Sequence, residues 1–152
     1  MVEALKEAEK AYQQGEVPVG AILVNSKGKI LLWAHNECVR RKNPLAHAEL
    51  LILMKANELG INLEDATLYV TLEPCLMCAS AVMLVRLKRV VYGAKNQLLG
   101  GIETIFNVTT EPNFQHNIRV KSGVLREEMQ DILKRFFENI RRKKHEQKIH
   151  CT

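Results

Sequence analysis

Apolar residues recur at helical spacing near both ends of the chain and gather in short runs between them. Near the N-terminus Val2, Leu5, Ala8 and Tyr12 lie three or four residues apart, which predicts an amphipathic helix that Gly15 can end. A longer amphipathic helix is predicted near the C-terminus, where one face carries Leu125, Met129, Ile132, Leu133, Phe136 and Ile140. Each helix would pack one apolar face against the rest of the protein.

Short apolar runs bounded by turn residues predict five strands. They lie at 19–24, 29–34, 66–72, 89–94 and 117–121. The first two are separated by the turn residues "NSKG" and therefore form a hairpin. The segment 95–115 is predicted to be mostly loop.

The two most apolar helices are predicted at about 46–59 and 74–86. Gly60 can end the first, and Pro74 suits the first turn of the second. Two strand–helix–strand crossovers predict parallel pairing, whereas the hairpin is antiparallel. We therefore expect an α/β fold in which these two helices are buried against a sheet.

Length and composition fit one globular domain. The chain has 152 residues, 47% of them hydrophobic, with no repeat or linker. It contains no uninterrupted apolar run of the roughly 18 residues that a membrane span needs. The first 16 residues are amphipathic and charged, unlike a signal peptide, so we expect a cytoplasmic protein. We expect residues 1–152 to form a single domain with a basic C-terminal helix at about 123–148.

Basic residues are concentrated at the C-terminal end. The formal net charge is +5, and the run "RRKK" at 141–144 is the densest group of basic residues. Such a run suits a phosphate backbone, but it equally suits a solvated helix end, where cations favour the helix dipole. Charge alone leaves both interpretations open.

Polar residues interrupt the two most apolar helices. His47 and Glu49 lie in "PLAHAEL", and Cys75 and Cys78 lie in "LEPCLMC". Buried polar groups need partners, and one imidazole with two thiolates suits zinc. A C-x-x-C pair at a helix start is also placed where the positive end of the helix dipole favours thiolate. We predict that both stretches share one zinc ion.

Three protein ligands leave one tetrahedral position for an activated water, which is typical of a catalytic zinc. Glu49 would then carry the proton of that water. Residues two apart on a helix point about 200° apart, so His47 and Glu49 do not share a simple helical face. The site is therefore predicted at the N-terminal end of the helix, near Pro44.

Two other interpretations of the cysteines were weighed. A C-x-x-C pair after a strand also suits a redox dithiol, but that leaves His47 and Glu49 unexplained. A structural zinc would need a fourth ligand, for which His35 and Cys38 are the candidates, while Cys151 is a tail residue. The open catalytic zinc accounts for more of the residues.

The pattern H-x-E followed by P-C-x-x-C is the signature of zinc-dependent nucleobase deaminases. Here it reads "HAE" at 47–49 and "PCLMC" at 74–78. With "GEVPVGAILV", "NPLAHAE", "ATLYVTLEPCLMC", "RVVYGAK" and "FFENIRRKK", the chain resembles the bacterial tRNA-specific adenosine deaminases over almost its whole length.

The resemblance implies a cytidine-deaminase-like three-layer α/β/α sandwich with a five-stranded mixed sheet, assembled as a homodimer. The implied activity is hydrolysis of a C–N bond of a cyclic amidine, converting adenosine to inosine at the wobble position of a tRNA anticodon. Each subunit would hold one Zn²⁺.

The resemblance also assigns roles by position. Zinc would be held by His47, Cys75 and Cys78, with Glu49 as the catalytic proton carrier. Asn36 would hydrogen-bond the flipped nucleotide. The base pocket would be shaped by Ala48, Val17, Pro18 and Leu72. The anticodon stem-loop would meet Asn96, Phe137, Arg141, Arg142 and Lys143.

The loop 95–104 departs from the family pattern. Asn96 stands where many relatives have Asp, bulky Leu98 and Leu99 stand where small residues are common, and Glu103-Thr104 replaces a usual Gly-Ser pair. Two other functions stay open. A deaminase of a free base or nucleoside, such as guanine or cytidine, would share the metal site, and a non-enzymatic zinc-stabilised RNA-binding module would not need Glu49.

Overall fold

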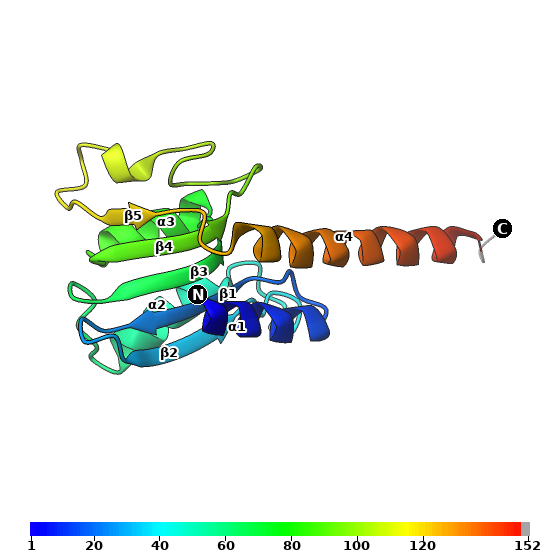
Figure 1. Cartoon of the computed structure of the whole chain (residues 1–152), viewed down its shortest axis with the longest axis horizontal. Coiled ribbons are helices and arrows are strands. Elements are labelled where there is room, and N and C mark those ends of the chain that lie inside the picture. Colours follow the sequence, from blue (N-terminus) through cyan, green and yellow to red (C-terminus); the bar gives the residue numbers. More distant parts are fainter. Residues whose placement is uncertain (150–152) are drawn as a thin grey trace.

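A five-stranded mixed sheet forms the middle layer of the protein (Figure 1). The computed structural model describes residues 1–149. The strands are β1 Gly20–Val24, β2 Ile30–His35, β3 Thr67–Leu72, β4 Arg89–Ala94 and β5 Arg119–Lys121. Their order across the sheet is β2-β1-β3-β4-β5. β1 is antiparallel to both β2 and β3, and the pairs β3–β4 and β4–β5 are parallel.

Only one of the two strand–helix–strand crossovers joins neighbouring strands of the sheet. The connection from β3 through α3 to β4 gives the predicted parallel pair. β2 and β3 also run in the same direction, but the prediction that they pair was wrong, because β1 lies between them. Every residue of β1 is buried, which suits an inner strand with partners on both sides, whereas β2 is only partly buried and suits the sheet edge.

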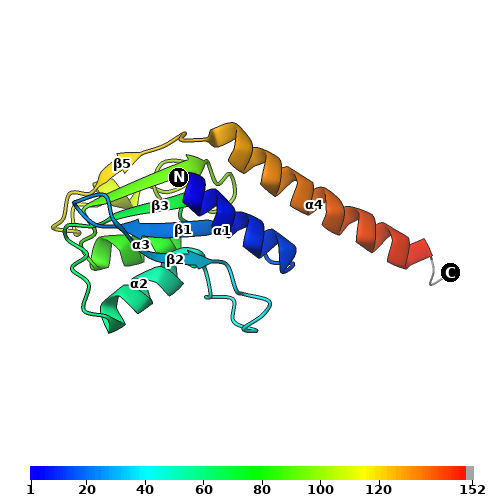
Figure 2. The same cartoon turned by 60° about the horizontal axis from the view of Figure 1, so that its bottom comes forward.

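Helices cover both faces of the sheet. They are α1 Val2–Gln13, α2 Ala48–Glu58, α3 Leu76–Leu84 and α4 Arg126–Ile149, with a short 3₁₀ helix at Val108–Thr110. α2 and α3 lie on one face, and α1 and α4 lie on the other (Figure 2). The predicted three-layer α/β/α sandwich is confirmed. α3 begins after Pro74 rather than at it, because Cys75 is the N-cap.

The main core lies between the sheet and the helices α2 and α3. Its buried side chains include Leu23, Ile52, Leu68 and Val82, so this layer holds the two helices firmly in place. α1 packs very closely on β1. A Cβ added at Gly20 would lie 2.1 Å from the backbone oxygen of Ala4.

α4 packs against the end of α1 and then extends beyond the body of the molecule (Figure 1). The rings of Tyr12 and Phe136 lie 5.8 Å apart, and the Asn139 amide donates to the Tyr12 hydroxyl. The predicted apolar face is confirmed where Met129 and Ile132 are buried. Residues 141–146 are exposed, so the basic run lies on a projecting helical arm.

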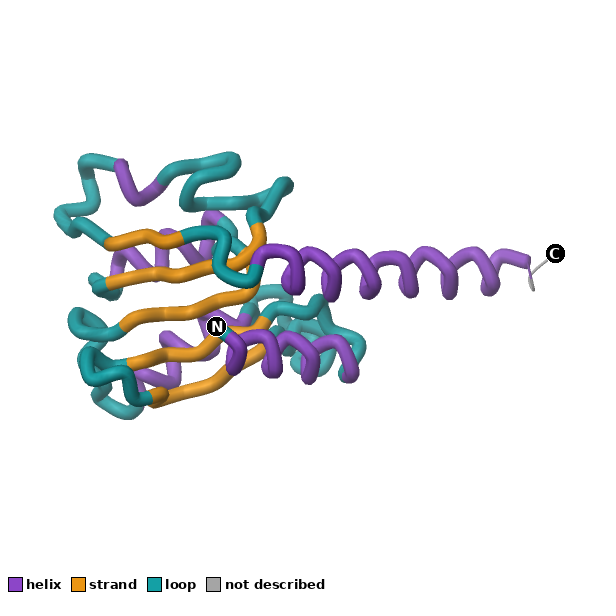
Figure 3. The backbone as a smooth tube through the Cα atoms, viewed as in Figure 1, coloured by secondary structure: helices purple, strands orange, loops and turns teal. Residues whose placement is uncertain are grey.

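The chain between β4 and β5 is loop apart from the short 3₁₀ helix (Figure 3). The expectation for 95–115 is thus confirmed. In residues 1–149 no helix combines the length and hydropathy that crossing a membrane requires.

Candidate metal centre and substrate site

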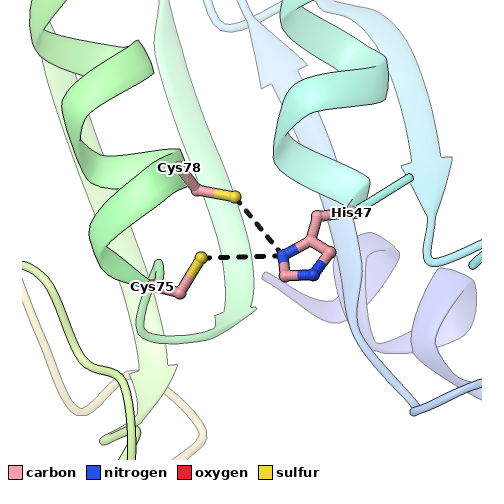
Figure 4. Close-up of side chains that lie close together, drawn as sticks. All are labelled: His47, Cys75 and Cys78. Carbon is pink, nitrogen blue, oxygen red and sulfur yellow. Dashed lines mark hydrogen bonds between the residues drawn. The ribbon is translucent and has the colours of Figure 1, made fainter. Parts of the chain in front are cut away.

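The N-termini of α2 and α3 bring three metal-ligating side chains together (Figure 4). His47 is the N-cap of α2, Cys75 is the N-cap of α3, and Cys78 lies in the first turn of α3. Both helices are held side by side on one face of the sheet by the main core. The cluster therefore forms from residues nearly thirty apart in sequence because two helix ends meet.

The spacing of the three side chains fits a tetrahedral zinc ion. His47 Nδ1 lies 3.6 Å from Cys75 Sγ and 3.5 Å from Cys78 Sγ. A tetrahedral ion with bonds of roughly 2.0 Å to nitrogen and 2.3 Å to sulfur would hold those atoms about 3.5 Å apart. The donor set and its spacing thus match zinc.

The pKa shifts of the two thiols also favour a bound cation at this place. A hydrogen bond from Cys78, aided by His47, lowers the pKa of Cys75 to about 4. The same hydrogen bond and burial raise the pKa of the Cys78 thiol far above its ordinary value. A divalent cation bound between the two sulfurs would favour the thiolate form of both.

Glu49 is buried next to the cluster, with 3% of its surface exposed. Burial raises its pKa to about 7. The backbone of His47 is extended, with φ −73° and ψ 147°, so it does not follow helical spacing. This geometry explains how His47 and Glu49 serve one site although they are two residues apart.

The other candidate ligands are engaged elsewhere. His35 Nδ1 lies 2.8 Å from Glu7 Oε2, and the Cys38 thiol points to the Pro44 carbonyl oxygen at 3.8 Å. Cys151 lies outside the described residues. A site with three protein ligands and one open position is therefore what the geometry supports.

Comparison with known proteins identifies the family. Residues 1–94, which include the three ligands and Glu49, match the cytidine and deoxycytidylate deaminase zinc-binding region. The chain is 49% identical over 146 residues to the tRNA-specific adenosine deaminase of Bacillus subtilis, across 95% of this chain and 90% of that protein. It is 42% identical over 140 residues to that of Aquifex aeolicus, across 91% of each. The chain belongs to the tRNA-specific adenosine deaminase family.

Solved structures agree with this family assignment. A structure from a study of A-to-I editing by tRNA adenosine deaminases at the wobble position of transfer RNA superposes with a TM-score of 0.82 at 38% identity, covering 88% of this chain and 97% of that one. A guanine deaminase from Nitrosomonas europaea gives 0.73 at 20% identity, covering 88% and 80%. The second likeness shows the shared fold alone. The cytidine-deaminase-like fold class is confirmed, and zinc is the cofactor of this family's matched region.

Asn36, one of the predicted substrate residues, is buried directly after β2. Its Oδ1 accepts the N–H of Ala48 at 3.0 Å, next to the ligand His47. Its own N–H donates to Val19 O at 3.0 Å, directly after Val17 and Pro18. The hydrogen bonds of Asn36 thus link Ala48 at the start of α2 with the segment that follows Val17 and Pro18, whereas Leu72 lies at the end of β3.

The predicted RNA contacts do not all converge with the zinc ligands. Asn96 caps its own loop, because its Oδ1 accepts the N–H groups of Leu98 and Leu99 at 3.2 and 3.0 Å. The other four lie on α4, on the opposite face of the sheet from α2 and α3 (Figure 2). All four are exposed: Phe137, Arg141, Arg142 and Lys143.

Two buried carboxylates, to which the sequence assigned no role, hold the loops beside the site. Glu16 accepts the N–H groups of Val39 and Arg40 at 3.0 and 2.8 Å in the loop that leads to His47. Glu73 does the same for the loop 96–104. In the sequence Glu16 lies shortly before an apolar strand and Glu73 directly after one, but the distant partners of these carboxylates are not visible there.

Zinc binding should depend on the cluster and stabilise the fold. We expect one zinc ion per chain and loss of that zinc in Cys78→Ser, measured by elemental analysis of purified protein. At a free zinc concentration about 1,000 times Kd, the free energy of unfolding should rise by about 4 kcal/mol. Cys38→Ser is the matched control and should retain zinc. Stoichiometric zinc in Cys78→Ser would contradict the assignment.

Proposed function

We propose that the chain is a tRNA adenosine deaminase that hydrolyses adenosine to inosine at the wobble position of an anticodon. The observation that carries this proposal is the three-ligand cluster with the buried carboxylate of Glu49 beside it. Three ligands leave room for a reacting water, and the carboxylate supplies the base that such a water needs. The similarity to tRNA-specific adenosine deaminases names the substrate class.

The proposed reaction assigns a task to each group at the site. Zinc held by His47, Cys75 and Cys78 supplies an activated water as nucleophile. The water oxygen would add to C6 of adenine while Glu49 takes one of its protons and passes it to N1. Glu49 would then take the proton that remains on the C6 hydroxyl and deliver it to the amino group, so that the C6–N bond breaks, ammonia leaves and C6 becomes a carbonyl. Inosine is the product, and atoms and charge balance without a further reactant.

Asn36 and its neighbours would hold the extruded nucleotide. Because Oδ1 of Asn36 is bound to Ala48, its amide N–H₂ is the end that would donate to the substrate. Val17, Pro18 and Leu72 would form the apolar surroundings of the base. A nucleotide in an anticodon loop suits such a pocket, since its base is already unpaired and costs little to splay out.

The basic arm of α4 would meet the anticodon stem-loop. Residues 141–146 are exposed, which suits contact with phosphates. The exposed ring of Phe137 lies at the base of this arm and would contact the RNA beside it. These roles favour an RNA substrate over the free base or nucleoside that the zinc site alone would also admit.

We also propose that each chain folds as one deaminase domain that acts in the cytoplasm, and that two copies form a homodimer. The outer surfaces of α2 and α3 expose large apolar side chains, with Met54 62% and Leu84 72% exposed. Exposed apolar residues on adjacent helices favour burial against another chain. A second copy is the proposed partner because these same helices carry the zinc-ligand candidates. Pairing through them would stabilise the zinc site of each chain.

Loss of the carboxylate should stop turnover without removing zinc. Glu49→Gln keeps the size of the side chain but cannot carry a proton, so inosine formation should fall by about 10²-fold or more. The assay is nucleoside mass spectrometry on an anticodon-arm RNA with adenosine at the wobble position, with free adenosine and guanine as comparison substrates. Full activity in Glu49→Gln would exclude this mechanism, and faster turnover of a free base would favour the alternative substrate class.

The charge of the α4 arm should set the salt dependence of RNA binding. Replacing Arg141, Arg142 and Lys143 by Gln should weaken binding and reduce the slope of log K against log salt by about 2 to 3, because fewer counterions are released. Replacing Lys6, Lys27 and Lys29 instead makes the same charge change elsewhere. Equal slopes for the two triple variants would count against the arm as the RNA contact.

The proposed dimer predicts a particle of twice the 17.3 kDa chain mass, measured by light scattering. Met54→Lys combined with Leu84→Lys should yield monomers, because each lysine would be buried without a partner. Val2→Lys changes an equally exposed apolar residue on the opposite layer and should leave the dimer intact. A monomeric wild-type chain, or dissociation by Val2→Lys, would refute this interface.

A further inference from the structure

Glu73 is one of the most deeply buried charged side chains of the molecule, yet it does not take part in the reaction. It follows β3 directly and lies two residues before the ligand Cys75, with 1% of its surface exposed. A carboxylate at this depth is stable only if hydrogen-bond donors replace its water. Those donors come from one loop, which the reaction scheme leaves without a role.

Both oxygens of Glu73 bind the two ends of the loop 96–104. Oε1 accepts the N–H groups of Ile102, Glu103 and Thr104 at 3.2, 2.7 and 3.0 Å. Oε2 accepts the N–H of Asn96 at 3.1 Å and the hydroxyl of Thr104. One side chain therefore closes the loop, because it joins the residue that begins it to the residues that end it.

The closed loop also lies against the segment that carries Cys75. Gly101 donates its N–H to Pro74 O at 2.8 Å, and Leu76 donates to Leu99 O at 3.1 Å. Cys75 and Gly100 form an antiparallel bridge between these two bonds. The fit is close, since a Cβ on Gly100 would lie 2.6 Å from Glu73 Oε2.

The tip of this fixed loop is apolar and solvent-exposed. Leu98 is 82% exposed and Leu99 is 57% exposed, although the backbone N–H groups of both are hydrogen-bonded to Asn96 Oδ1. Because hydrogen bonds hold the backbone of this loop beside the zinc ligands, Leu98 and Leu99 would lose less conformational freedom on contact with a base than leucines of a mobile loop. An ordered apolar tip at this place suits an unstacked nucleobase next to the target.

We propose that Glu73 is a positioning residue for substrate binding. It holds the loop 96–104 so that Leu98 and Leu99 form a ready-made wall for a base flanking the target adenosine. Glu73 itself is buried and touches no substrate. This inference rests on the proposed function, and it predicts that losing the Glu73 carboxylate weakens RNA binding more than it slows the chemical step.

The test compares Glu73→Gln with wild type on the anticodon-arm RNA. Whichever way the Gln amide turns, its N–H₂ meets an N–H of the loop, so part of the clasp is lost while the size is kept. KM should rise by about tenfold, with kcat within about threefold. Zinc should stay stoichiometric, and the amides of Asn96 and of 102–104 should exchange with solvent faster. Glu7→Gln, at an equally buried carboxylate outside the loop, should leave KM unchanged.

Two results with Glu73→Gln would overturn this role of Glu73. One is an unchanged KM, and the other is a fall in kcat with loss of zinc, which would show that Glu73 supports only Cys75. If Glu73→Gln does not fold, Thr104→Val removes one donor, keeps the carboxylate and should give a smaller rise in KM. A wild-type chain that forms no inosine contradicts the proposed function, whereas an active one with an unchanged variant KM contradicts only the role of Glu73.

Discussion

The structure depends on the meeting of two helix N-termini at one point. His47 and Cys75 are both N-caps with extended backbone, so each lies at the N-terminal end of its own helix. The main core fixes α2 and α3 side by side on the sheet, and that packing sets the 3.5 and 3.6 Å separations between imidazole and sulfur. A metal centre on two loops would lack this rigidity.

The surroundings of the site rely on buried carboxylates that bind backbone. Glu16 fixes the loop before His47, and Glu73 fixes the loop beside Cys75. In each case the cost of burying a charge is offset by several N–H donors that would otherwise need water. Each of these two loops adjoins a segment that carries a zinc-ligand candidate, so the same hydrogen bonds that stabilise the fold also fix the surroundings of the metal cluster.

Much of the fold and of the metal site could be predicted from the sequence, because both depend on local spacing. In the part of the chain that the structure describes, the apolar pattern located the four α-helices and the five strands but not the short 3₁₀ helix, and the residue types at His47, Cys75 and Cys78 indicated zinc. Contacts between distant residues could not be predicted in this way. The pairing of β3 with β1 rather than β2 follows from burial of β1 on both faces, and Glu73 finds its donors 23 to 31 residues further along. Such partners are visible only once the chain is folded.

Zinc-edge X-ray absorption of the purified protein would test whether the zinc site is open and has three protein ligands. We expect two sulfur neighbours at about 2.3 Å and one imidazole nitrogen at about 2.0 Å, with a fourth light-atom neighbour that is not a protein side chain. The result should change to one sulfur in Cys78→Ser if any zinc is retained. A shell of four protein ligands, or of four sulfurs, would leave no place for a nucleophile and would contradict the account.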